Sequence, residues 1–118
     1  MIDIQTAPEI VVDRGQPIIV TVSFCADVNN PEPDLVDFAY TRPGEARPYT
    51  DDGYGQPRSK IVRLSRGVYR YVISTVGFPS GDGAWHCQGE WKETHPDGYD
   101  TASIFGAYRV NQAPVQLL

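Results

Sequence analysis

Strict alternation of apolar and polar residues is the feature that most constrains how this chain can fold. Within residues 17–26, four large apolar side chains occupy every second position: Ile18, Val20, Val22 and Phe24. A period of two places such side chains on one face of a β-strand. Helical periodicity is nearly absent from the sequence. We therefore expect an all-β protein in which each strand packs one face against a core.

The same alternation marks further strands, and turn-forming residues separate them. The chain has 118 residues, and its 11 glycines and 10 prolines are spread along it as punctuation between short elements. About seven short strands at fairly regular spacing are typical of a two-sheet antiparallel sandwich. We expect one domain over residues 1–118, with terminal arms at 1–8 and 111–118. The expected strands are residues 9–13 (a weaker pattern), 17–26, 35–41, 60–64, 68–75, 84–92 and 101–110.

The inward faces of these strands define the expected core. Trp85, Cys87 and Trp91 share one face of the strand at 84–92. The preceding Gly-Asp-Gly segment, residues 81–83, is expected to form a turn. Seven residues are expected to build the core: Val20, Val22, Phe24, Phe38, Tyr69, Trp85 and Trp91.

Composition and charge exclude several classes of protein. The net charge is -5 and the isoelectric point is near 4.8, whereas a nucleic-acid binder needs an excess of Lys and Arg to neutralise phosphates. No apolar run is long enough to span a membrane. The first ten residues lack both a basic leader and an apolar segment, so we expect no secretory signal. We expect neither nucleic acid nor membrane as a partner.

The two cysteines lie on strands where immunoglobulin domains place their inter-sheet disulfide. Cys87 lies on the inward face of its strand, but Cys25 lies opposite the apolar face of residues 17–26. A bridge would need a bulge or a shifted register, because one residue of slip exchanges the two faces. Since no secretory signal is visible, we expect two free thiols.

No residue pattern marks a catalytic, metal or cofactor site. His86 and His95 are the only histidines, and neither has other ligands at metal-binding spacing. The acidic segments 51–53 and 97–100 lack the regular ligand ladder of a calcium loop, and we interpret them as turns. The sequence contains neither a nucleophile elbow nor a phosphate-binding glycine loop. We expect no enzymatic activity, no metal and no cofactor.

Two internal segments and the apolar end are candidates for contact with other proteins. Residues 58–70 carry five basic side chains and no acid. This segment is either a solvated strand face or a charge-complementary contact with another copy or an acidic partner. The loop 44–58 is either functional or an extended connection between sheets with an extra short edge strand. The apolar segment 114–118 is expected to contact a sheet edge, a neighbouring copy or a larger assembly. The candidate contact residues are Tyr49, Tyr54, Arg58, Lys60, Arg63, Arg66, Val115, Leu117 and Leu118.

The order of several segments resembles a known group of proteins. A strand that ends in Pro43-Gly44 is followed by Gly67-Val68-Tyr69 and then by Gly83-Ala84-Trp85. This succession, over residues 14–110, resembles small immunoglobulin-like proteins encoded among the virion genes of tailed bacteriophages. The loop 44–58 and the cysteine pair have no counterpart in that group.

The resemblance implies an immunoglobulin-like sandwich with a non-enzymatic structural role. Such a protein would be a capsid decoration (cement) protein or a head, neck or tail accessory. It would reside in the virion and be assembled in the host bacterial cytoplasm. Its partners would be capsid, neck or tail subunits and copies of itself.

A carbohydrate-binding or adhesion module is the alternative. In that case Trp85 or Trp91 would face solvent and stack on a sugar ring. The alternation instead places both tryptophans in the core, which favours the structural role.

Overall fold

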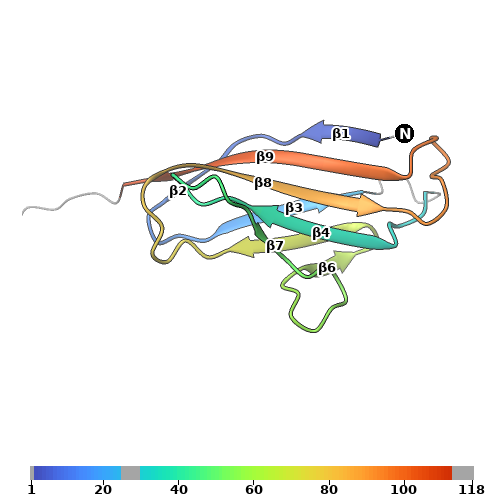
Figure 1. Ribbon diagram of the computed structural model, residues 1–118, viewed down its shortest axis with the longest axis horizontal. Helices are drawn as coiled ribbons and strands as arrows, with labels where there is room; N and C mark the ends of the chain where they lie inside the picture. The colour runs from blue at the N-terminus through green and yellow to red at the C-terminus, as the bar shows by residue number, and fades with distance from the viewer. Residues whose placement is uncertain (1, 25–29, 113–118) are drawn as a thin grey trace, which may run out of the picture.

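A computed structural model describes residues 2–24 and 30–112 of the chain. Within these residues the chain forms nine β-strands and no helix. The strands lie in two sheets (Figure 1). Their bounds are β1 Ile2–Thr6, β2 Ile10–Asp13, β3 Ile18–Ser23, β4 Leu35–Tyr40, β5 Tyr49–Thr50, β6 Val62–Ser65, β7 Val68–Ile73, β8 Gly81–Glu90 and β9 Thr101–Asn111.

The larger sheet has the strand order β1-β9-β8-β4-β5, and β2 also pairs with β9. The smaller sheet has the order β3-β7-β6. Most pairings are antiparallel, and the buried face of each sheet turns toward the other. The expectation of an all-β, two-sheet protein is confirmed, and the arrangement is consistent with a β-sandwich.

The expected antiparallel pairing dominates both sheets, but the N-terminal strands depart from it. Both β1 and β2 run parallel to β9, with Ile2 opposite Thr101 and Ile10 opposite Tyr108. The chain follows β9 along most of its length before it crosses to the smaller sheet, so two successive strands take the same direction. Residues 2–6, within the expected N-terminal arm, form β1 on this sheet edge.

The expectation of a turn at residues 81–83 is wrong, because these residues begin β8 and pair with the end of β9. A Cβ atom on Gly83 would lie 2.2 Å from Cζ of Tyr108, so glycine is required there for the ring to cross the strand. The turn occurs earlier, around Gly77, whose φ is +81°.

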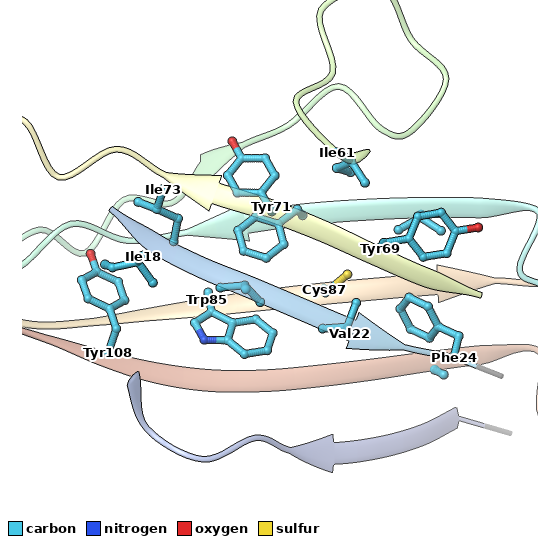
Figure 2. Close-up of a cluster of buried hydrophobic side chains, with 14 of the residues drawn as sticks. Ile18, Val22, Phe24, Ile61, Tyr69, Tyr71, Ile73, Trp85, Cys87 and Tyr108 are labelled. Carbon is cyan, nitrogen blue, oxygen red and sulfur yellow. The ribbon is translucent and has the colours of Figure 1, made fainter. Parts of the chain in front are cut away.

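The core lies between the sheets (Figure 2). All seven residues expected from the alternation are buried in it. Phe38 stacks on Tyr71 with ring centroids 4.0 Å apart, and on Trp85 at 5.9 Å. Cys87 is a buried free thiol, and burial raises its pKa to about 12. Cys25 lies outside the described residues.

Candidate binding groove

A groove of about 300 Å³ runs beside β5, at one edge of the larger sheet. Three of the expected contact residues, Tyr49, Arg58 and Lys60, line this groove, and all three come from β5 and the connection that follows it. The other residues that line the groove are Tyr40, Thr50, Asp51, Asp52 and Tyr71.

One wall of the groove is a set of tyrosines held in fixed orientations. The ring of Tyr49 stacks on Tyr40 with centroids 5.5 Å apart, and the guanidinium of Arg42 lies 4.8 Å from the same ring. Arg42 also covers the ring of Phe78 at 5.0 Å. The hydroxyl of Tyr49 donates a 3.0 Å hydrogen bond to Glu45, and this bond raises the pKa of Tyr49. Tyr49 is thus an exposed aromatic whose ring position is set before any partner arrives.

The floor of the groove is organised by the Asp51 carboxylate. One oxygen, Oδ2, accepts hydrogen bonds from Ser59 Oγ at 2.6 Å and from the backbone N–H of Gly53 at 2.9 Å. The other, Oδ1, accepts from the backbone N–H of Lys60 at 2.8 Å. Because both oxygens of Asp51 accept hydrogen bonds from the loop, this carboxylate fixes the shape of the groove.

Two cations at the rim of this groove are free to meet a partner. The side chains of Arg58 and Lys60 are exposed, and neither forms an ion pair with the described part of the chain. Asp52 lines the same groove as these two cations. The groove therefore places two cations, Arg58 and Lys60, and two carboxylates, Asp51 and Asp52, next to a rigid aromatic wall.

The long loop proves to be an extended connection with an extra short edge strand, and it also lines the groove. After β5 it continues along β4, with a 2.9 Å hydrogen bond from the N–H of Tyr54 to the carbonyl of Val36. Tyr54 then packs edge-on against Tyr69 with centroids 5.3 Å apart and remains partly exposed. Tyr54 therefore lies outside the groove.

The basic segment does not form one continuous face. Arg63 pairs with Glu32, with Nε and Oε1 2.6 Å apart. Glu32 also accepts hydrogen bonds from the N–H of Gly67 at 3.1 Å and from the Tyr69 hydroxyl at 2.7 Å. Hydrogen bonding from Arg63, with these added donors, lowers the pKa of Glu32 to about 2. Arg66 donates to the carbonyl of Asn30, so Arg63 and Arg66 anchor the segment at 30–32.

A buried cluster around His95 is the main feature that the sequence analysis missed. His95 is 1% exposed, stacks on Tyr99 at 4.1 Å and meets the edge of Trp91 at 5.2 Å. Its Nδ1 accepts a hydrogen bond from the N–H of Asp97 at 3.1 Å, so a neutral ring carries its proton on Nε2, 3.1 Å from the Tyr99 hydroxyl. The sequence signal that could have predicted this cluster is the regular spacing of Trp91, His95 and Tyr99 around a Pro-Asp-Gly turn.

His86 lies on the outer face of the larger sheet, as expected. Its ring stacks on Phe105 with centroids 4.5 Å apart, and burial lowers its pKa. Within residues 2–24 and 30–112, no group of three or more His, Cys, Asp or Glu side chains is placed to hold a metal ion. The same residues include no helix long and apolar enough to cross a membrane.

Three expected contact residues, Val115, Leu117 and Leu118, lie outside the described residues.

In comparisons with known proteins, no protein-family model matches the chain, and no curated protein matches it.

Proposed function

We propose that the chain is an immunoglobulin-like, non-enzymatic structural protein of tailed-bacteriophage virions. The succession of Pro-Gly, Gly-Val-Tyr and Gly-x-Trp motifs supports this proposal. The strand order supports it too, because β9-β8-β4-β5 opposed to β3-β7-β6 corresponds to the G-F-C-C′ and B-E-D strands of immunoglobulin domains. One departure is that β1 pairs with β9, whereas the first strand of such domains pairs with the second. On this proposal the protein assembles into the virion in the host bacterial cytoplasm.

The role we propose is a capsid decoration (cement) or head-neck accessory protein that binds other virion subunits through the groove beside β5. The observation that carries this role is the pre-set Tyr49 ring in a groove that also holds Arg58 and Lys60, two cations that form no ion pair with residues 2–24 or 30–112. Tyr, Trp and Arg are enriched among the residues that contribute most of the binding energy at protein interfaces. A virion shell repeats each partner surface many times, so a weak single contact is sufficient.

Co-sedimentation with purified phage heads and tails tests the role. Wild-type protein should pellet with one of these particles, and Tyr49→Ala or Arg58→Glu should weaken binding by about tenfold or more. Arg14→Glu is the matched control, since Arg14 lies at the opposite edge of the larger sheet, in the turn after β2. Wild-type protein that pellets with no virion particle would contradict the virion role. Full binding by Tyr49→Ala would place the contact elsewhere on the domain.

A carbohydrate-binding module is the second candidate, and the open tyrosine wall of the groove favours it. Trp85 and Trp91 are both buried, so sugar stacking would have to use Tyr40 and Tyr49. Titration with oligosaccharides, followed by the NMR shifts of Tyr49 and Lys60, distinguishes the two candidates. Saturable shifts with a glycan favour the module, whereas binding to virion particles alone favours the structural role.

A further inference from the structure

The two edge strands of the smaller sheet are protected very differently. In β6 the register against β7 shifts between Arg63 and Ser65, and Arg63 places a charge on the strand. Bulges and charges are devices by which natural sheets prevent pairing between edges. By contrast, β3 pairs with β7 without interruption over six residues, from Ile18 to Ser23, and carries no charge or proline.

The edges of the larger sheet are also protected. β5 is only two residues long, and β1 and β2 carry Asp3 and Asp13. Among the edge strands in the described part of the chain, β3 is therefore the one that combines length, regularity and absence of charge. Such an edge is a template for another strand.

The backbone groups that β3 offers to a partner can be identified. The N–H of Phe24 donates to the carbonyl of Gly67 at 2.8 Å, so this residue bonds toward β7. Bonded positions recur at every second residue of an antiparallel ladder, which places the N–H and C=O groups of Ile19, Thr21 and Ser23 at the open edge. All three residues are exposed, and β7 is the strand that pairs with β3 in the described residues.

No described strand covers this edge. β1 pairs with β9 and leaves a cavity of about 280 Å³ between itself and the end of β3. Asp3 and Gln5 line one side of that cavity, and Ser23 and Phe24 line the other.

We propose that β3 pairs with β3 of a second copy of this chain, antiparallel about a two-fold axis at Thr21. The edge is self-complementary, because the axis brings Thr21 opposite Thr21 and Ile19 opposite Ser23. The free N–H and C=O groups of these residues then face those of the second copy. A two-fold contact sets each residue near its own counterpart, and the uncharged strand brings no like charges together. Arg70, the nearest cation on the outer face, would lie three strand spacings from its counterpart, about 14 Å, where salt screens repulsion.

This inference goes beyond the proposed function, since it depends on the edge of the smaller sheet and not on the groove. Its result would be one continuous six-stranded sheet shared by two copies. The two β5 grooves would remain open, because β5 belongs to the other sheet. The dimer would thus present two copies of the groove, and binding to a repetitive shell would gain from this bivalency.

Sedimentation velocity of the full chain tests the dimer. The mass should rise from 13.1 kDa toward twice that value as protein concentration increases. Thr21→Lys puts two like charges opposite each other and should weaken association by about tenfold or more. The matched control is Val72→Lys, which is also an exposed position on the same outer face but lies on the central strand β7. It should leave the dimer intact.

Two results would overturn the proposal. One is a wild-type chain that stays monomeric up to about 1 mM, the weak end of specific association. The other is a dimer that Val72→Lys disrupts and Thr21→Lys does not, which would indicate packing through the face of the sheet.

Cross-linking tests the register independently of affinity. Paired residues on antiparallel strands have Cα atoms about 5.5 Å apart at bonded positions, within the range of a disulfide. In a Cys25→Ser background, Thr21→Cys should form a covalent dimer on oxidation, and Val72→Cys should not. A dimer in which Thr21→Cys does not cross-link would refute this axis.

Discussion

Trp85 lies within β8 and Trp91 directly follows the end of that strand, and both side chains are buried in the core, yet the molecule holds them in different ways. The indole N–H of Trp85 has no hydrogen-bond partner among residues 2–24 and 30–112, and the ring is held by Phe38 and by the bare backbone of Gly106. The indole N–H of Trp91 donates to the carbonyl of Pro31 at 2.9 Å, and its ring meets the edges of its aromatic neighbours.

This difference shows that the two ends of the core depend on different forces. The centre depends on shape, because a Cβ on Gly106 would lie 2.2 Å from Cε2 of Trp85. The end near Trp91 depends on directional bonds that tie loops to the sheets, including those of Glu32 and His95. Four substitutions, two at each end of the core, test this difference through the stability of the fold.

The largest effect is expected from Trp85→Ala. Removal of a buried aromatic side chain should lower the free energy of unfolding by about 3–5 kcal/mol, measured by chemical denaturation. Phe105→Ala is the control, because Phe105 is an exposed aromatic on the outer face of the same sheet and should cost less than about 0.5–1 kcal/mol. A loss below about 1 kcal/mol for Trp85→Ala would show that the centre is not packed around this ring.

Gly106→Ala tests the shape of the site under Trp85. The added methyl should cost about 1–3 kcal/mol, because the ring has to move away from the strand. In a Trp85→Ala background the same change should cost less than about 0.5 kcal/mol, since the clash is gone. Equal costs in both backgrounds would contradict the proposed fit between ring and glycine.

Acid titration tests the bonds of Glu32 at the other end. The folded pKa is about 2, below the ordinary value of 4.5, so the stabilisation is complete above pH 4.5 and is lost as pH falls from 4.5 toward 2. After allowance for partial exposure we expect about 1–2 kcal/mol. Glu32→Gln should flatten the pH dependence of unfolding in this range. A profile unchanged by this substitution would show that Glu32 does not tie its loop to β6 and β7.

The smallest effect is expected from Tyr99→Phe. This change removes the hydroxyl that lies 3.1 Å from Nε2 of His95, at a cost of about 1 kcal/mol. Tyr54→Phe, at an exposed tyrosine outside this cluster, should be nearly neutral. Equal effects of the two substitutions would mean that His95 is held by packing alone.

The alternation of residues predicted the buried centre of the core around Trp85, but not the hydrogen bonds at the end near Trp91. Period two placed Trp85 and Trp91 inward because side-chain direction on a strand follows from the backbone alone. The long loop and the basic segment, not the alternation, marked Tyr49, Arg58 and Lys60 as contact candidates, and nothing in the sequence predicted that they line one groove. His95 lies in a turn-rich loop without periodicity, and its burial depends on where that loop folds back against Trp91.

By itself, then, the order of residues determined which side of each strand is apolar, and hence an all-β chain with a two-sheet core. Only the tertiary structure decided that β1 and β2 both follow β9, that Glu32 pairs with Arg63, and that no described strand covers the outer edge of β3. The physical reason is range. Side-chain alternation is a local property of the extended chain, whereas strand partners and ion pairs join residues far apart in sequence and depend on how all the strands pack together.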